Sequence, residues 1–359
     1  MPGNKVSSIW MFLLFCALPL LFTACGSESN NAPSSQTSLK QEVKTALPVA
    51  NDVGITVLQP MNQSRSLFAA AKGKNGHIYV FGGSDGAPLT TGSILSSFES
   101  YDPITGVWSN LQAMPGPKAW EKAATAPDGT IYLFGGSTDS SPSTDVWAYN
   151  PVSKTWNTSL PKMPVAERDT VAVTGRNGII YLFGGYSNYN VAQAFNPRTK
   201  TWQLKAPMPT GRWAAAGALG PDGKIYIVGG GAPGEPDYGV YNTLEVYDPV
   251  TDTWATKSSM PTARNYLAAA FGRDGKLYAI GGEVYGAGRT GIIYNVIEAY
   301  DPSTDTWENA GNLPQELSAL SAVTDNQGNI HVLGGYNLYE SFNTQYKLFT
   351  GAPAPFPVP

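Results

Sequence analysis

The sequence has few of the residues that most often carry covalent cross-links, metal chemistry or acid–base catalysis. Its 359 residues include two cysteines, Cys16 and Cys25, and two histidines, His77 and His331. Both cysteines lie near the N-terminus, so no disulfide is expected in the rest of the chain, which must rely on its core for stability. We expect each histidine to pack in or beside a strand rather than to ligate a metal or catalyse a reaction.

Several motifs of known chemistry are also missing. The sequence contains no HExxH, no phosphate-binding glycine-rich loop, no cluster with metal-ligand spacing and no Ser-His-Asp set. We therefore expect neither a metal nor another cofactor. The formal net charge of -4 argues against nucleic acid as a partner, because the phosphate backbone attracts basic proteins.

The N-terminus forms a separate region. Lys5 precedes an apolar run over residues 9–22, which is short for a membrane span and typical of a signal peptide. The run leads into FTAC, which resembles a bacterial lipobox, in which the cysteine is lipidated. We predict a lipoprotein signal peptide over residues 1–24 and a lipid anchor on Cys25. An ordinary cleaved secretory signal is the alternative.

Residues 25–54 are polar and rich in Ser, Asn and Thr, so they predict a flexible tether behind Cys25. Gly26 and Ser27 stand where lipoproteins retained in the inner membrane usually carry an aspartate. The sequence therefore predicts an exported, membrane-anchored protein of the bacterial cell envelope, held in the outer membrane if the cell has two membranes. The Pro-rich tail over residues 351–359 is expected to be unstructured.

The remaining sequence repeats one pattern six times with a period of about fifty residues. In each copy an Ala-rich run, a tight turn such as Asn75-Gly76 and an apolar run lead to paired glycines, which end at Gly83, Gly136, Gly185, Gly230, Gly282 and Gly335. In five copies an aromatic residue such as Tyr101 then precedes a tryptophan such as Trp108 by seven residues, across an Asp-Pro or Asn-Pro turn. These signals predict four antiparallel strands per copy.

The constant spacing within the copies favours blades repeated around an axis, with a β-sandwich or a solenoid as alternatives. The small side chains of the Ala-rich strand suit the crowded axis, and the glycines and aromatics suit close contact between neighbouring blades. The sixth copy lacks the Asp-Pro turn and the tryptophan. We predict that residues 55–61 supply its fourth strand, so that an N-terminal strand completes the last blade and closes the ring.

The double glycines and the spaced Tyr and Trp resemble the kelch-repeat family over residues 55–349. This resemblance implies an all-β fold, a six-bladed β-propeller over residues 55–350, and it is specific for fold but weak for function. The galactose-oxidase branch of kelch proteins uses copper, a tyrosyl-cysteine cross-link and histidine ligands. That activity is excluded because no cysteine follows Cys25.

The connections between the second and third strands vary most in length, so the face that carries them, called the loop face, is the expected binding surface. Aromatic side chains gather in these connections and suit stacking on sugar rings or contact with a protein segment, although they could equally pack locally. The candidate binding tyrosines are Tyr186, Tyr189, Tyr238, Tyr285 and Tyr336.

A second group of candidates stands at one fixed offset in each copy, near the start of the innermost strand. Its members are Arg65, Lys118, Glu167, Arg212, Arg264 and Leu317. Four of the six are cationic, which would suit a ring of cations that binds a carboxylate or phosphate at the channel mouth. The alternative is that these arginines bond carbonyl groups of neighbouring blades.

These patterns predict a binding module of the cell envelope that recognises a glycan or an envelope protein. We expect it to contact the membrane through its lipid anchor alone. A scaffold within an envelope complex would give the same patterns. The alternative function is a metal-independent sugar mutarotase or epimerase, similar to exported kelch proteins that interconvert anomers of sialic acid. Glu167, Asp169 and Glu121 could serve such acid–base chemistry, but no residue can be assigned as catalytic.

Overall fold

The computed structural model describes residues 53–87, 92–139, 141–231, 239–285 and 291–351. The predicted signal peptide, Cys25, almost all of the tether and the tail beyond Gly351 lie outside the described residues. No helix long and apolar enough to cross a membrane occurs within these ranges.

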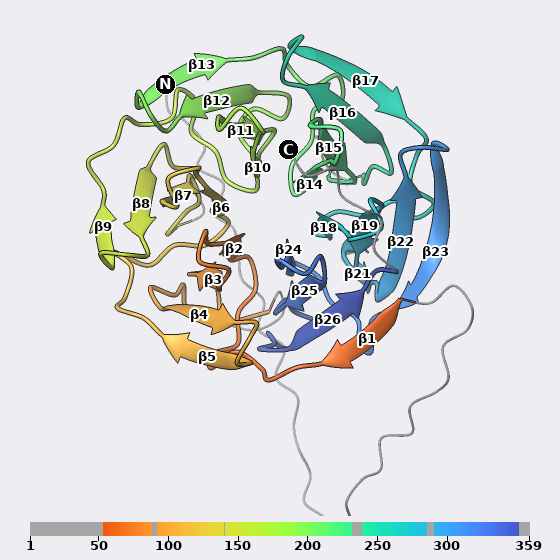
Figure 1. Ribbon diagram of the computed structural model, residues 1–359, viewed down its shortest axis with the longest axis horizontal. Coiled ribbons are helices and arrows are strands. Elements are labelled where there is room, and N and C mark those ends of the chain that lie inside the picture. Colours follow the sequence, from red (N-terminus) through yellow and green to blue (C-terminus); the bar gives the residue numbers. More distant parts are fainter. Residues whose placement is uncertain (1–52, 88–91, 140, 232–238, 286–290, 352–359) are drawn as a thin grey trace, which may run out of the picture. The chain divides into compact units, whose positions relative to one another are not determined.

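Six four-stranded antiparallel sheets stand around a central axis as the blades of a propeller (Figure 1). The first strands, next to the axis, are β2 (Ala69–Lys72), β6 (Lys122–Thr125), β10 (Val171–Thr174), β14 (Ala216–Leu219), β18 (Ala268–Phe271) and β24 (Ser321–Thr324). The second strands are β3 (Ile78–Phe81), β7 (Ile131–Phe134), β11 (Ile180–Phe183), β15 (Ile225–Val228), β19 (Leu277–Ile280) and β25 (Ile330–Leu333).

The outer half of each blade follows the same order. The third strands are β4 (Phe98–Asp102), β8 (Val146–Asn150), β12 (Ala192–Asn196), β16 (Leu244–Asp248), β22 (Val296–Asp301) and β26 (Gln345–Phe349). The fourth strands are β5 (Val107–Asn110), β9 (Thr155–Asn157), β13 (Thr201–Leu204), β17 (Thr253–Lys257), β23 (Thr306–Asn312) and, in the last blade, β1 (Gly54–Val57). A small hairpin, β20 (Glu283–Tyr285) with β21 (Gly291–Ile293), lies in the second-to-third connection of blade 5.

The N-terminal strand closes the ring, as the sequence predicts. Strand β1 pairs antiparallel with β26, from Gly54 opposite Phe349 to Val57 opposite Tyr346. The last sheet therefore has the order β1-β26-β25-β24 and combines the two ends of the propeller sequence. Contacts between β24 and β2 complete the circle at the axis.

Aromatic side chains fill the wedges between blades, which confirms the role predicted for them. Tyr149 of blade 2 packs in one cluster with Phe81 and Phe98 of blade 1, and Trp156 meets Phe98 edge-on at 5.3 Å between ring centroids. The first glycine of each pair permits the same close approach along the backbone. A Cβ at Gly135, whose φ is +61°, would lie 2.1 Å from the carbonyl oxygen of Glu167 in the next blade.

A closed ring of backbone hydrogen bonds surrounds the axis at the loop face. In each blade the N–H of one residue donates to the carbonyl of its counterpart in the preceding blade, at 2.7 to 3.1 Å. These six residues, called the axial ring, are Leu67, Trp120, Asp169, Ala214, Tyr266 and Ala319. All six have positive φ values of 48° to 59° although none is glycine. The ring bonds help to offset that strain.

Candidate functional site at the axial end of the loop face

The arginines of the predicted cation ring lie inside their own blades. The side chains of Arg65, Arg212 and Arg264 are at most 1% exposed and bond the carbonyls of Gly82, Gly229 and Gly281, respectively, which are the first glycines of their own blades. Each guanidinium also forms an ion pair with a buried glutamate of the third strand. The pairs are Arg65 with Glu99, Arg212 with Glu245 and Arg264 with Glu298.

This geometry contradicts the expected ring of exposed cations at the channel mouth. A buried arginine must be paired, and these three donate to carbonyl and carboxylate oxygens of the protein, although the Nε of Arg65 has no acceptor among the described residues. The alternative interpretation describes them better, except that they bond carbonyls of their own blade rather than of a neighbour. A sequence signal for the pairs was present, because Glu99, Glu245 and Glu298 each stand two residues before the repeated tyrosine.

Blades 2 and 3 depart from this arrangement. In blade 2, Lys118 lies 4.1 Å from the ring centroid of Trp147 and 3.5 Å from the half-exposed carboxylate of Asp145. In blade 3, Glu167 occupies the same position, and its carboxylate accepts the backbone N–H groups of Ser187 and Asn188 at 2.9 and 2.8 Å. Both side chains are buried, so neither presents its charged group freely to solvent.

The candidate tyrosines are dispersed in the structure. Tyr186 lies half-buried near the axis, whereas Tyr189 is half-buried and offers its backbone carbonyl to the N–H of Arg212 at 2.7 Å. Tyr336 is buried, and its hydroxyl donates to the Glu283 carboxylate at 3.0 Å. Tyr238 lies outside the described residues, and Tyr285 belongs to β20, with its side chain outside the description.

A cluster of aromatic side chains does gather around one arginine at the channel mouth. The guanidinium carbon of Arg168 lies 4.2 Å from the ring centroid of Tyr186 and 5.2 Å from that of Trp120. Trp213 meets Tyr186 edge-on at 6.0 Å and Tyr266 at 5.4 Å. We call these five residues, Trp120, Arg168, Tyr186, Trp213 and Tyr266, the mouth cluster. Apart from Trp213, which is 8% exposed, they are half-buried.

Arg168 differs from the buried arginines in its partners. Among the described residues its side chain forms no hydrogen bond and no ion pair, whereas each buried arginine has both. Two aromatic faces hold the cation in place, which restricts its side-chain freedom without neutralising it. The arrangement can therefore accept an anionic oxygen from a ligand.

Three carboxyl groups with raised pKa values stand beside this cluster in blades 2 and 3. Burial raises the pKa of Glu121 to about 8, that of Glu167 to about 7 and that of Asp169 to about 6. Both carboxyl oxygens of Glu121 are buried and without a hydrogen-bond partner among the described residues. The hydroxyl of Tyr266 reaches across from blade 5 to within 3.5 Å of the Asp169 carboxylate.

Four residues of the mouth cluster are not predicted from the sequence as site residues: Trp120, Arg168, Trp213 and Tyr266. They lie one or two positions after the fixed offset that drew attention to Arg65 and its counterparts, and they follow no repeated residue type. The positive φ of the axial ring turns this segment toward the mouth, and nothing in the side chains indicates that turn. The available signal was the residue type at these positions. They carry aromatic or charged side chains where most other copies have Ala, Leu or Ser.

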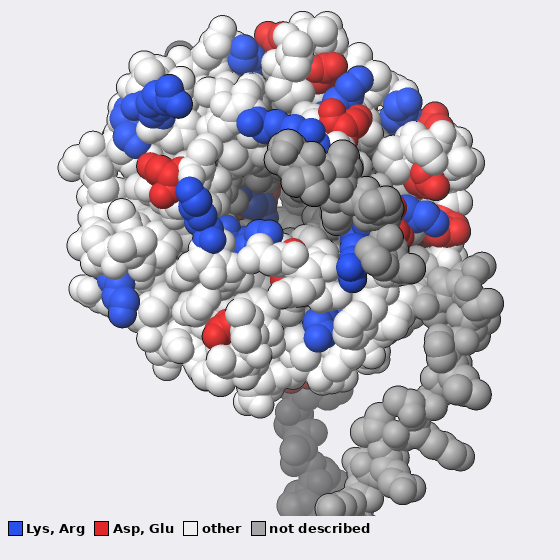
Figure 2. Space-filling view, viewed as in Figure 1, with Lys and Arg blue, Asp and Glu red and all other residues white. Residues whose placement is uncertain are grey.

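The described residues contain no cluster able to hold a metal. Figure 2 shows the face of the ring that carries the hairpin turns, opposite the mouth cluster, with Lys and Arg side chains around the central hollow. Within the ranges that the structure describes, no group of three or more His, Cys, Asp or Glu side chains could bind a metal ion. His331 is buried in a packing role, since its ring nitrogens bond Asp325 and Gln345, each at 3.0 Å.

Comparison with known proteins agrees with this architecture. The Attractin/LZTR1 beta-propeller model matches residues 117–341, more than half of the chain, and the Kelch motif model matches residues 69–115. Kelch-like protein 35 of Mus musculus is 28% identical over 261 residues, which are 72% of this chain and 41% of that protein. Kelch-like protein terF of Aspergillus terreus is 29% identical over 342 residues, which are 88% of this chain and 69% of that protein.

A solved structure shows the same fold at low sequence identity. The structure of YjhT aligns with a TM-score of 0.67 and 17% identity, covering 82% of this chain and 97% of that chain. The chain spans less than half of the mouse relative, so the relationship concerns the propeller region. With its six double-glycine blades and the match over residues 117–341, the chain belongs to the kelch-repeat β-propeller family.

Proposed function

We propose that this protein is a binding module of the bacterial cell envelope that recognises a glycan or protein through the loop face of its propeller. Membership of the kelch family supports a protein-interaction module. The observation that carries the proposal is Arg168, a cation over the rings of Trp120 and Tyr186 that forms no hydrogen bond or ion pair among the described residues, although the carboxyl group of Asp169 is close enough to feel its charge. A suitable ligand offers a carboxylate to Arg168 and a ring or apolar face to the aromatic side chains.

The test compares acidic and neutral ligands on the same protein. An array of glycans and acidic peptides is screened first, and the affinity of each hit is measured for the unaltered protein and for Arg168→Met. Loss of a charge-assisted hydrogen bond weakens binding by about 1.5 to 3 kcal/mol, which is more than tenfold. We expect this loss for acidic ligands and little change for neutral ones. Equal affinity of both proteins for every ligand would contradict the proposal.

A second function is favoured by the three carboxyl groups near the mouth cluster. Their pKa values of about 6 to 8 would let one group act as a base while another acts as an acid near neutral pH. This suits a metal-independent mutarotase or epimerase acting on an acidic sugar. Exchange spectroscopy by NMR on an equilibrating acidic sugar distinguishes the functions, because catalysed anomer exchange supports the enzyme and binding without exchange supports the module.

We further propose that the protein is exported and held at the membrane by a lipid on Cys25. The sequence FTAC carries this part of the proposal. Each buried acyl methylene contributes about 0.8 kcal/mol, so several chains give stable attachment. Cys25→Ser should move the protein to the soluble envelope fraction, and the N-terminal peptide of the unaltered protein should carry acyl mass. Retention of the variant, with no acyl mass on the original, would refute the anchor.

A further inference from the structure

The channel has a cavity at the end opposite the loop face. This end, called the turn face, carries the hairpin turns between first and second strands (Figure 2), and the cavity there has a volume of about 600 Å³. Such a volume lies within the range of small-molecule sites, about 300 to 1,000 Å³. The residues of the mouth cluster do not line this cavity, so it is separate from the candidate site at the loop face.

One position at the end of the first strand lines the cavity in every blade. It holds Lys72 in β2, and its counterparts in the following blades are Thr125, Thr174, Leu219, Phe271 and Thr324. The three threonine hydroxyls donate to the carbonyl of the same position in the preceding blade, at 2.7 to 2.9 Å. Their donors are thus in use, and Lys72 is the one charged member of the six.

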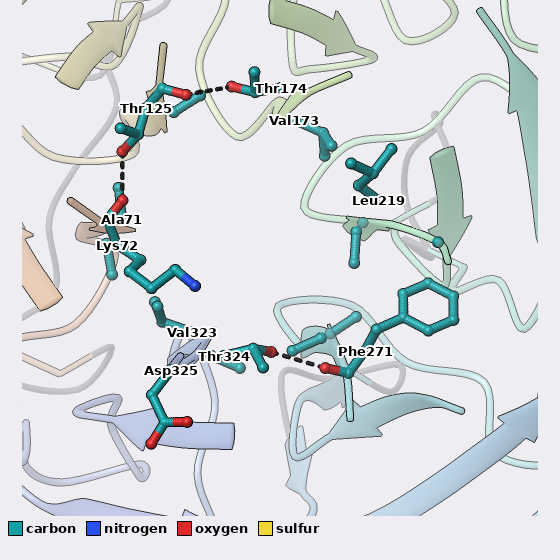
Figure 3. A pocket seen from close by; sticks show the side chains of 18 of the residues that line it. Ala71, Lys72, Thr125, Val173, Thr174, Leu219, Phe271, Val323, Thr324 and Asp325 are labelled. Carbon is teal, nitrogen blue, oxygen red and sulfur yellow. Dashed lines mark hydrogen bonds between the residues drawn. The ribbon is translucent and has the colours of Figure 1, made fainter. Parts of the chain in front are cut away.

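The half-buried amino group of Lys72 points into the cavity (Figure 3). Its single hydrogen bond among the described residues goes to Oδ1 of Asn326, at 3.0 Å. An ammonium group has three donors, so two remain for a ligand. Burial lowers the pKa of Lys72, and the charge of Asp325 raises it in part. The ammonium group has therefore lost some of its water, and an anion that reaches it would compensate for that loss.

Asp325, the one acidic residue in the lining, has little capacity left for a ligand. Its carboxylate accepts the backbone N–H groups of Gln327 and Asn329, each at 2.9 Å, and the side-chain amide of Asn329 at 3.1 Å. It also bonds Nε2 of His331 at 3.0 Å. These four contacts use about all the lone-pair positions that a carboxylate offers. The cavity thus presents unused donors on Lys72 but no comparable acceptor, which favours an anion over a cation.

The remaining lining combines a basic rim with small apolar walls. Arg176 is exposed at the rim, where it donates to the carbonyl of Pro221 and adds a second positive charge. Deeper in the channel the wall carries only methyl groups and glycine, from Ala70, Ala123, Ala172, Gly217, Ala269 and Ala322. A ligand that fits both parts has an anionic group at one end and a slim apolar body at the other.

We propose that the turn-face cavity binds a small carboxylic acid with a short apolar chain. Its carboxylate accepts hydrogen bonds from Lys72, and its chain lies along the alanine wall of the channel. Charge-assisted hydrogen bonds of this kind are stronger than those between neutral groups. The inference is independent of the proposed function, because the ligand lies at the opposite end of the channel from the mouth cluster.

Isothermal titration of the full chain with hexanoate tests the proposal, with hexylamine and hexanol as probes of similar length and different charge. We expect hexanoate to bind, and the other two to bind more weakly by about tenfold or more. Lys72→Met should weaken hexanoate by about the same factor, because it removes the charge and keeps the length of the side chain. Lys72→Arg should retain most of the affinity. Lys74→Met, on the same hairpin but outside the lining, is the matched control and should change nothing.

A second variant tests the apolar half of the site without touching Lys72. Ala123→Leu narrows the channel wall and should abolish hexanoate binding, and it decides the question if Lys72→Met proves unstable. Arg168→Met, at the loop face, should leave hexanoate binding unaltered. No binding of hexanoate at millimolar concentration, or full binding by both Lys72→Met and Ala123→Leu, would overturn the proposal. Loss of binding in Arg168→Met alone would also overturn it, because the carboxylate would then occupy the mouth cluster.

Discussion

Blades 1, 4 and 5 differ from blades 2 and 3 at the same structural position. In the first group a buried arginine is paired with a glutamate of its own blade. In the second group the position holds Lys118 or Glu167, and the neighbouring residues are Arg168, Asp169 and Glu121. Regular blades thus satisfy their charges internally, whereas the irregular blades leave a cation and several carboxyl groups for other uses. The departure from the repeat, rather than the repeat, marks the candidate site.

The largest effect is expected from breaking a regular pair. Arg264→Met leaves Glu298 buried without its partner, and such a change typically costs about 3 to 5 kcal/mol of unfolding free energy. Chemical denaturation measures this loss. Arg264→Met combined with Glu298→Leu removes both charges and should recover most of the stability. A single variant within about 1 kcal/mol of the unaltered protein would show that the pair is not a packing element.

The irregular blades should show a pH dependence that the regular pairs do not explain. Because burial raises the pKa of Glu121 to about 8 from 4.5, the folded protein binds more protons than the unfolded chain between these values. Stability should therefore fall as pH rises from about 4.5 to 8. Glu121→Leu should flatten this slope and gain about 1 to 3 kcal/mol at pH 9. Glu167 and Asp169 shift in the same direction, so part of the slope remains.

The control for that experiment is the comparison of stabilities at two pH values. Denaturation at pH 5 should give a smaller gain for Glu121→Leu than denaturation at pH 9, because the carboxyl group is protonated in the folded state at pH 5 and only the cost of its unpartnered oxygens is then removed. A gain of equal size at pH 5 and pH 9 would mean that the introduced leucine packs better and that the titration of Glu121 is not responsible.

Lys118 sharpens the contrast between the two groups of blades. Its partner Asp145 has a side chain that is 40% exposed, and its other contacts are the carbonyl of Gly135, to which it donates at 3.0 Å, and the ring of Trp147. Lys118→Met should therefore cost about 1 to 2 kcal/mol by denaturation, still below the loss expected for Arg264→Met. Equal losses for the two variants would remove the distinction that we draw between the regular and irregular blades.

The smallest effect on stability is expected at Arg168. Since its guanidinium forms no ion pair among the described residues and is held by cation–π contacts alone, Arg168→Met should lower the unfolding free energy by about 1 kcal/mol or less while weakening acidic ligands more than tenfold. Arg198→Met, at an exposed turn of blade 3, is the matched control and should alter neither quantity. A drop of several degrees in melting temperature for Arg168→Met alone would assign Arg168 to packing.

The repeat made the fold predictable, because each strand and turn is repeated with constant spacing. The double glycines, the Asn-Gly and Asp-Gly turns and the missing sixth tryptophan together gave the blades and the closure by β1. The site was harder to predict from the sequence. Its geometry depends on positive φ at residues such as Trp120 and Tyr266, and a residue that is not glycine does not announce a positive φ in the sequence. The repeat also misled, because Arg65 and its counterparts share an offset for packing rather than for a ligand.

The pairing of β1 with β26 sets the order in which the molecule can be completed. The first strand of the propeller leaves the ribosome long before its partner exists, so it must wait, unpaired, until the final strand is made. Blades 1 to 5 can form earlier from neighbouring segments, but blade 6 cannot. A chain that is halted or cleaved before Phe349 therefore remains an open arc with an unpaired β edge, a form that quality-control proteases can recognise.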